Sequence, residues 1–534
     1  MPPNKLIDMH THMFNGFYVP IEDILHHKFT FEWAVATSLG AIIKCAIEKE
    51  GPPPWGVETA WRAGAEDPDN TDLLAEILLD RVKKRLQKEL LRHTPSVVAE
   101  KQGTSSLFEN ITGFISHQAR ETKAVFDPRQ LSDSLTPFLI PRESMTEEKM
   151  REDKLSGMLD DLLLPPLKDK LSALKGYVDF FVKMLQDDRT LCVELIEKNY
   201  DETNRPALTV HLMMDMDPAY KKPGEPFIGA EYDFHETQIP RASELVASAN
   251  GRLLGFVAFD PRRGDVGVDR CIAALDQGNI GIKVYPPLGY KPDELVSRPS
   301  LGRLYDECTR MDIPILTHCT PRGFEAWKDL GVNSDPSYWE KVLEQFPNLR
   351  LCFGHAGGGY FRDTKIYNKT SQKEERVDLK GWYCTDEDEE EWSGFGYPRK
   401  IIDFCVTYKN VYTDFSYLHD MIYNVKGERE IFKQRLKHAF FHTHGTCPFR
   451  DKIIYGTDWH MSQLVNSTQK YVEMFKRIFE EEDFKAFRDG FFFVNAVRFL
   501  NLRKYVEKER SRPTPFFSEE ALSHLETLVE MASG

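Results

Sequence analysis

The sequence predicts an α/β protein: a (β/α)8 TIM-type barrel with a large helical insertion near the first β/α unit. Eight short apolar runs recur along the 534-residue chain, and from about residue 205 they alternate with helical stretches. This alternation is typical of right-handed β-α units around a parallel sheet. The runs are largely continuous in apolar residues rather than alternating, as expected for strands that are buried on both faces. They lie at 5–10, 207–215, 252–260, 280–287, 313–319, 349–355, 410–416 and 452–458.

A region of different character follows the first run. Apolar residues such as Leu74, Ile77 and Leu78 recur at helical spacing, which places them on one helix face. We therefore expect residues 30–204 to form a helical insertion that either caps the pocket or builds an interface in a homo-oligomer. The predicted domain organisation is residues 1–29 as the first strand and its loop, 30–204 as the insertion, 205–505 as the rest of the barrel, and 506–534 as a C-terminal helical tail.

Composition excludes several classes of protein. The formal net charge of −15 argues against nucleic-acid binding, because neutralising phosphates requires clustered lysine and arginine. The nine cysteines are scattered without a CxxC pair, which favours free thiols in a reducing cytosol. The most apolar stretch, 31–47, is too short to span a membrane and carries Glu32 and Lys44. The N-terminus lacks the profile of a secretory signal, so we expect a cytoplasmic protein with no membrane partner.

Polar residues capable of chemistry fall at or near the carboxyl ends of the predicted strands. In a β/α barrel these ends form the active-site face, so residues that are distant in sequence converge there. A single strand-end histidine is usually a satisfied structural residue, but so many at one end of the barrel make coincidence a poor explanation. The residues are His10, His12, Lys283, His318, His355 and Asp458.

The tripeptide His-Thr-His occurs twice, at 10–12 and at 442–444. The second copy follows a helical stretch and precedes the eighth strand by several residues. We expect it on the face opposite the chemistry, with no metal role for His442 or His444.

The motifs DMHTH, GIKVYPP, ILTHC, FGHAGGG and YGTDW occur in this order. Together they resemble the amidohydrolase superfamily, and most closely its amidohydrolase 2 branch, which includes aminocarboxymuconate-semialdehyde decarboxylase-like enzymes and metal-dependent hydrolases. The resemblance covers residues 5–14 and about 205–503, where FFFVNAVRFLNL is similar to the closing helix of the family. It implies a (β/α)8 barrel with one or two divalent ions and reactions that are hydrolytic or decarboxylating. It explains neither the insertion nor the acidic segment 384–391.

The expected first metal ion is held by His10, His12 and Asp458. Two imidazoles at i and i+2 can turn toward one ion where a strand breaks into a loop. Imidazole and carboxylate suit zinc, manganese or iron, and we expect zinc; an open coordination position would make bound water acidic near neutral pH. Asp458 would accept a proton from the attacking water and deliver it to the leaving group.

Lys283 determines the number of ions, and three interpretations remain open. As a carbamate it would bridge two ions, the second held by His318 and His355; GIKVYPP resembles the dihydroorotase segment that supplies such a lysine. As an ammonium it would bind a substrate carboxylate, while His318 joined the first ion and His355 acted as a catalytic base or hydrogen-bond partner. As a structural residue it would form half of an ion pair.

Four further side chains follow strand ends and are candidates for substrate contact: Tyr285, Arg322, Trp459 and His460. Arg322 is the best match to a carboxylate, because guanidinium fits that geometry. Each is otherwise an ordinary loop residue. The Gly-rich segment 354–361 lacks the Lys-Ser/Thr of a P-loop, so we expect its glycines to let the backbone pass close to the site.

The leading functional hypothesis is a metal-dependent hydrolase of a C–N or C–O bond (amide, cyclic amide, lactone or ester) in a small, carboxylate-bearing molecule. The first alternative is a metal-dependent non-oxidative decarboxylase on the same scaffold. The second is a non-catalytic binding or assembly protein whose working part is the helical insertion.

Overall fold

The computed structural model describes residues 4–13, 188–220, 234–327, 329–359, 361–368, 373–383, 396–424, 427–441, 445–459 and 468–533. The chain divides into two units, Met1–Pro20 with Lys183–Gly534, and Ile21–Val182. All described residues belong to the first unit. Most of the predicted insertion, the acidic segment 384–391, the second His-Thr-His and His460 lie outside the described residues.

Eight parallel strands form one sheet, in the order β1-β2-β3-β4-β5-β6-β9-β10. They are β1 Ile7–Thr11, β2 Leu208–Leu212, β3 Leu253–Phe259, β4 Asn279–Val284, β5 Ile315–Thr317, β6 Leu351–Phe353, β9 Val411–Phe415 and β10 Ile453–Tyr455. The end strands approach each other, because the amide of Asp458 donates to the carbonyl of His10 over 2.6 Å. The sheet is therefore a nearly closed barrel, and the predicted TIM-type fold with its eight strands is confirmed.

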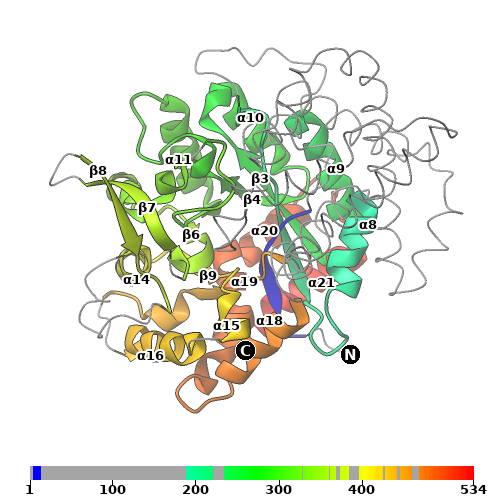
Figure 1. Ribbon diagram of the computed structural model, residues 1–534. Coiled ribbons are helices and arrows are strands. Elements are labelled where there is room, and N and C mark those ends of the chain that lie inside the picture. The colour runs from blue at the N-terminus through cyan, green and yellow to red at the C-terminus, as the bar shows by residue number, and fades with distance from the viewer. Residues whose placement is uncertain are drawn as a thin grey trace, which may run out of the picture. The chain divides into compact units, whose positions relative to one another are not determined.

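Helices cover the outside of the barrel (Figure 1). Their apolar residues recur every three or four positions; in α18, for example, Tyr471, Val472, Phe475 and Ile478 are buried. Each helix packs with this apolar stripe against the outer face of the strands, and this packing fixes its position on the barrel. The longer helices are α9 Phe234–Ser248, α10 Gly264–Ala274, α11 Pro299–Met311, α14 Tyr397–Thr407, α16 Glu428–Phe441, α18 Thr468–Ile478, α20 Leu502–Arg510 and α21 Glu519–Met531. The shorter helices are α8 Asp188–Val193, α12 Glu340–Gln345, α15 Asp420–Tyr423 and α19 Asn495–Leu500.

One inserted feature interrupts the simple alternation of strand and helix. Strands β7 (Phe361–Asn368) and β8 (Lys373–Leu379) form a separate antiparallel pair between β6 and α14, which the sequence analysis did not predict (Figure 1). The chain then returns to the core at Trp382, which is buried and whose indole donates to the carbonyl of Ala356 over 2.8 Å. The segment that follows the inserted pair is therefore held, through Trp382, against the turn after β6.

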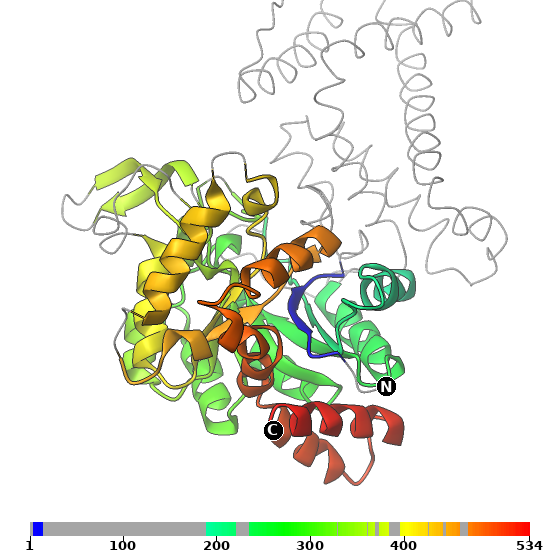
Figure 2. The ribbon, with the colours of Figure 1, turned by 90° about the horizontal axis from the view of Figure 1, so that it is seen from below.

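The C-terminal helices α20 and α21 (red in Figure 2) lie together on one side of the barrel. A Cβ atom on Gly251, just before β3, would lie 2.6 Å from the carbonyl oxygen of Ala521 in α21. These helices therefore pack near the amino ends of the strands, opposite the face where the chemistry is predicted. None of the described helices is long and apolar enough to cross a membrane. The seven cysteines within the described ranges are free thiols.

Candidate metal centre

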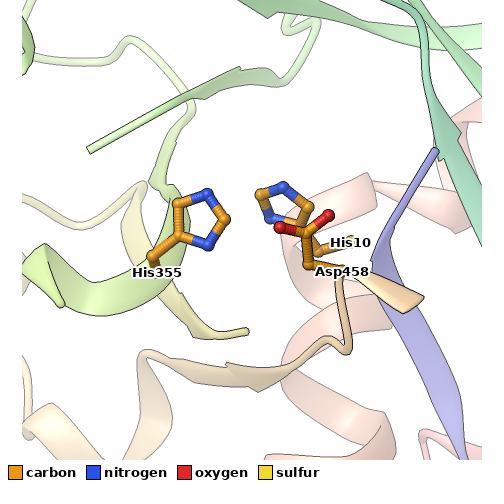
Figure 3. A group of neighbouring side chains, drawn as sticks. All are labelled: His10, His355 and Asp458. Atoms are coloured by element: carbon orange, nitrogen blue, oxygen red, sulfur yellow. The ribbon is translucent and has the colours of Figure 1, made fainter. Parts of the chain in front are cut away.

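Three predicted ligands from distant parts of the chain meet at the carboxyl end of the barrel. His10 comes from β1, His355 from the turn η8 (Gly354–Gly357) after β6, and Asp458 from the segment after β10. Their ligand atoms all lie within 4.8 Å of one another, and all three residues are buried. Figure 3 shows the two imidazoles and the carboxylate grouped together.

The backbone turns sharply where two of these side chains leave their strands. His355 has φ 63°, Ala356 φ 49° and Asp458 φ 54°, in the left-handed region that residues other than glycine seldom adopt. Glycine is required two residues before Asp458, since a Cβ on Gly456 would lie 2.7 Å from the Cβ of His10. Conformations of this kind persist where the surrounding structure holds them, and they cluster at functional sites.

In His10, on β1, and in His12, just after it, one ring nitrogen is held by a hydrogen bond within the protein and the other points toward the site. His10 Nδ1 lies 2.9 Å from Asp414 Oδ2, while His10 Nε2 is buried without a hydrogen-bond partner in the described structure. His12 Nδ1 donates to the carbonyl of Leu212 over 2.7 Å, and His12 Nε2 lies 3.9 Å from Asp458 Oδ1. Anchoring the far nitrogen in this way is what orients a histidine ligand toward a metal ion.

The histidines that follow β5 and β6 face each other. His318 Nδ1 lies 3.0 Å from His355 Nε2, and His318 Nε2 donates to the carbonyl of Arg322 over 2.7 Å. Two nitrogens that each bind one ion at about 2.1 Å and at right angles are themselves about 3.0 Å apart. The pair therefore has the spacing of two ligands to a single ion.

Burial keeps the imidazoles neutral. It lowers the pKa of His318 to about 3, with the charge of Lys283 acting in the same direction. Burial also lowers the pKa of His10, His12 and His355 well below the ordinary value. Neutral imidazole is the form that binds metals, so the histidines are ready as ligands without losing a proton.

Asp458 and Lys283 are two ionisable groups of the site whose pKa values are shifted by burial. Burial raises the pKa of Asp458 to about 7, and the nearby Lys283 opposes this rise while Asp414 adds to it. Asp458 Oδ1 has no hydrogen-bond partner among the described residues. With this pKa, the carboxyl group of Asp458 can take up or release a proton near neutral pH.

Lys283, on β4, is 1% exposed. Its Nζ has no hydrogen-bond partner in the part of the chain that the structure describes. Burial lowers the pKa of Lys283 to about 8, against the attraction of Asp414 and Asp458. An ammonium this deeply buried is costly unless a partner or a chemical change neutralises it.

The predicted substrate contacts have different surroundings. The Tyr285 hydroxyl accepts a hydrogen bond from the amide of Phe324 over 2.8 Å, and its ring stacks on His318 with centroids 4.5 Å apart. The Arg322 side chain is exposed, whereas Trp459 is buried and its indole donates to the carbonyl of His12 over 2.6 Å.

Sequence reasoning missed four buried polar residues beside the predicted ligands: Asp8, His211, Asp414 and Ser416. Asp8 accepts hydrogen bonds from Thr457 and from the hydroxyl of Tyr200. Asp414 contacts His10. For Asp8 and Asp414, the sequence offered one signal that could have identified them: each is an acidic residue within an otherwise apolar run, KLIDMH and NVYTDFS.

The donor set fits a divalent ion. It combines neutral imidazoles with a carboxylate, which suits zinc, manganese or iron. Two of its buried atoms, His10 Nε2 and Asp458 Oδ1, lack partners within the described ranges. Buried polar atoms are rarely left unsatisfied, so a ligand to both atoms is expected.

The chain is similar to several solved structures, whereas no curated protein matches it. Among solved structures, the chain is similar to a putative 2-pyrone-4,6-dicarboxylic acid hydrolase from Pseudomonas putida, with 13% identity, a TM-score of 0.35, and coverage of 56% of this chain and 83% of that chain.

Two decarboxylases are also similar to the chain. The 2,6-dihydroxybenzoate decarboxylase from Rhizobium has 14% identity, a TM-score of 0.33, and coverage of 60% and 88%. The 5-carboxyvanillate decarboxylase from Novosphingobium aromaticivorans, solved with manganese and 4-hydroxy-3-methoxy-5-nitrobenzoic acid, has 12% identity, a TM-score of 0.36, and coverage of 59% and 80%.

The family comparison covers a similar share of the molecule. The model of the amidohydrolase family matches residues 209–502, which is more than half of the 534-residue chain and includes seven of the eight barrel strands. His10, on the remaining strand β1, and His12, directly after that strand, precede the matched region. The chain therefore belongs to the amidohydrolase family.

Proposed function

We propose that this protein is a metal-dependent hydrolase that cleaves a C–N or C–O bond in a small, carboxylate-bearing molecule. The observation that carries the proposal is the convergence of buried, unpartnered atoms, His10 Nε2 and Asp458 Oδ1, beside His355. Leaving such atoms unsatisfied costs about 1–3 kcal/mol each, and more for a charged group. A divalent ion between them would remove this cost.

His10, His12 and Asp458 would hold the first ion, and His318 with His355 would hold a second. A divalent ion in this setting supplies a Lewis acid and lowers the pKa of water that it binds. The pKa of Asp458, raised to about 7 by burial, suits a group that takes up a proton from water and returns it to the leaving group. The 3.0 Å spacing between His318 Nδ1 and His355 Nε2 supports the second position.

Lys283 would link the two positions as a carbamate. Only the neutral amine adds carbon dioxide, forming a new N–C bond and releasing a proton. With a pKa lowered to about 8, roughly a tenth of the Lys283 side chains are neutral at pH 7. The reaction would replace a buried cation, whose Nζ has no hydrogen-bond partner among the described residues, by an anion that divalent ions could bind.

The second candidate function is a non-oxidative decarboxylase with one ion. Lys283 is a buried cation without a hydrogen-bonded carboxylate among the described residues, which also suits an ammonium that binds a substrate carboxylate. In this arrangement His318 would join the first ion, and His355 would act as a base or hydrogen-bond partner. Arg322, Tyr285, Trp459 and His460 remain proposed substrate contacts in both schemes.

Metal counting tests the proposal. The full chain is stripped with a chelator and then loaded with Zn²⁺ with and without bicarbonate. We expect two ions per chain with bicarbonate and fewer without it. One ion regardless of bicarbonate would favour the decarboxylase, and no bound ion would favour the binding or assembly role.

Turnover provides the second test. Asp458→Asn keeps the shape of the side chain but removes its ability to carry a proton. We expect a loss of about 10²-fold or more in kcat against a panel of small amides, lactones and aromatic carboxylates. Full activity in this variant would remove the proton role of Asp458.

A further inference from the structure

Asp414, at the end of β9, receives hydrogen bonds from two predicted metal-binding segments. Its carboxylate is completely buried. Oδ2 lies 2.9 Å from His10 Nδ1, and Oδ1 accepts from the amides of His355 and Ser416 over 3.0 and 3.1 Å. An ionised carboxylate can only accept hydrogen bonds. The contact with His10 therefore places the proton of that imidazole on Nδ1 and leaves the lone pair on Nε2.

Ser416 fixes the tautomer of His355 in a similar way. Its hydroxyl lies 2.5 Å from Asp414 Oδ1 and 2.8 Å from His355 Nδ1. Ser416 has one hydroxyl proton, and the charged carboxylate is the stronger acceptor. The serine oxygen then accepts from His355 Nδ1, so the lone pair of His355 also lies on Nε2.

His318 is fixed from the other side. Because its Nε2 donates to the carbonyl of Arg322, its Nδ1 carries a lone pair. His318 Nδ1 and His355 Nε2 then face each other across 3.0 Å with two lone pairs and no proton between them. Only a cation makes this contact favourable.

We propose that Asp414 and Ser416 are positioning residues that fix the tautomers of His10 and His355, so that the Nε2 atoms of both rings face the metal centre. Neither residue needs to touch the ion. The inference rests on the proposed metal site and adds two residues that determine its affinity. Removing a hydrogen-bond partner of a metal-binding histidine typically lowers metal affinity by about 10–100-fold.

Two variants test the proposal. In Asp414→Asn, the amide either donates to His10 Nδ1, which moves the ring proton to Nε2, or turns its NH2 group toward the backbone amides. In Ser416→Ala, His355 Nδ1 loses its acceptor. We expect zinc affinity, measured by chelator competition on the full chain, to fall by about 10–100-fold in Asp414→Asn and by a smaller factor in Ser416→Ala. Ser416→Thr keeps the hydroxyl and should restore wild-type affinity.

Thr413→Val is the matched control. Thr413 is buried on the same strand, and its hydroxyl donates to the carbonyl of Phe353 over 2.7 Å. The variant therefore loses a buried hydrogen bond of similar kind, and we expect zinc affinity to stay at the wild-type level. Equal affinity in wild type, Asp414→Asn and Ser416→Ala would overturn the positioning role. Failure of the wild-type chain to bind zinc at all would instead overturn the proposed metal site.

Discussion

Replacing Lys283 with methionine should stabilise the metal-free protein. The side chain is buried, and its Nζ makes no hydrogen bond within the described structure, so the folded state bears the cost of removing a charge from water. Methionine has a similar length and no charge. The substitution removes the cost with little change in packing.

The size of the effect follows from the pKa of Lys283, which burial lowers from 10.5 to about 8. Below pH 8 both folded and unfolded chains carry the proton, and the folded state bears the full penalty. Between pH 8 and 10.5 the unfolded chain binds more protons, so the stability of the wild type rises with pH. At 1.36 kcal/mol per pKa unit, Lys283→Met should gain about 3 kcal/mol at pH 7 and only about 1 kcal/mol at pH 9.5.

The assay is urea denaturation of both chelator-treated proteins in carbon dioxide-free buffer at pH 7 and 9.5. Lys452→Met is the matched control. Lys452 is also buried, and both ammonium groups lie over a tyrosine ring: Lys283 Nζ is 5.8 Å from the centroid of Tyr285, and Lys452 Nζ is 4.6 Å from that of Tyr412. The difference is that Lys452 Nζ also donates to the carbonyl of Lys409. Burial also lowers the pKa of Lys452, so this variant is relieved of a buried charge too, but it leaves a carbonyl without its donor at a cost of about 1–3 kcal/mol. Its stability should therefore lie well below that of Lys283→Met. A destabilised Lys283→Met, or a gain that does not shrink at pH 9.5, would refute the reasoning.

The remaining predictions concern metal binding, packing and acid stability. His10→Ala and His12→Ala should each abolish zinc binding measured by metal analysis, while His442→Ala should leave it unchanged; equal loss in all three would overturn the choice between the two His-Thr-His copies. Gly456→Ala should lower the melting temperature by several degrees, because the new Cβ would lie 2.7 Å from the Cβ of His10. His211 should make the fold sensitive to acid. Burial lowers its pKa to about 3, so the unfolded chain binds the proton first, and stability should fall as pH drops from 6.5 toward 3 by up to about 1.4 kcal/mol per pH unit. Urea midpoints of His211→Gln should depend less on pH in this window, and an unchanged slope would contradict the assignment.

The strands could be predicted because their signal is local. A strand buried on both faces must be apolar along its whole length, and each of the eight runs was recognisable for that reason. The β7–β8 pair was missed because it lies outside the barrel and lacks such an apolar run: KEERVDL in β8 is mostly charged.

The six predicted chemical residues were identified from their position at strand ends, and Asp414 was missed although it lies at one as well. Its role depends on contacts with His10 and with the amide of His355, residues that are 404 and 59 positions away. A single acidic residue in an apolar run does not show which groups it will meet. Only closure of the barrel, which places β9 between β6 and β10, defines these partners.

The sequence by itself determined the barrel and the end of it that carries the chemistry, because hydrophobic periodicity and strand order are properties of the chain. The tertiary structure decided which nitrogen of each imidazole faces the centre, and it brings His318 Nδ1 within 3.0 Å of His355 Nε2. It also decided that Lys283 is buried and that its Nζ has no hydrogen-bond partner in the described structure. These properties depend on desolvation and on hydrogen-bond partners from other strands, and both exist only when the barrel is closed.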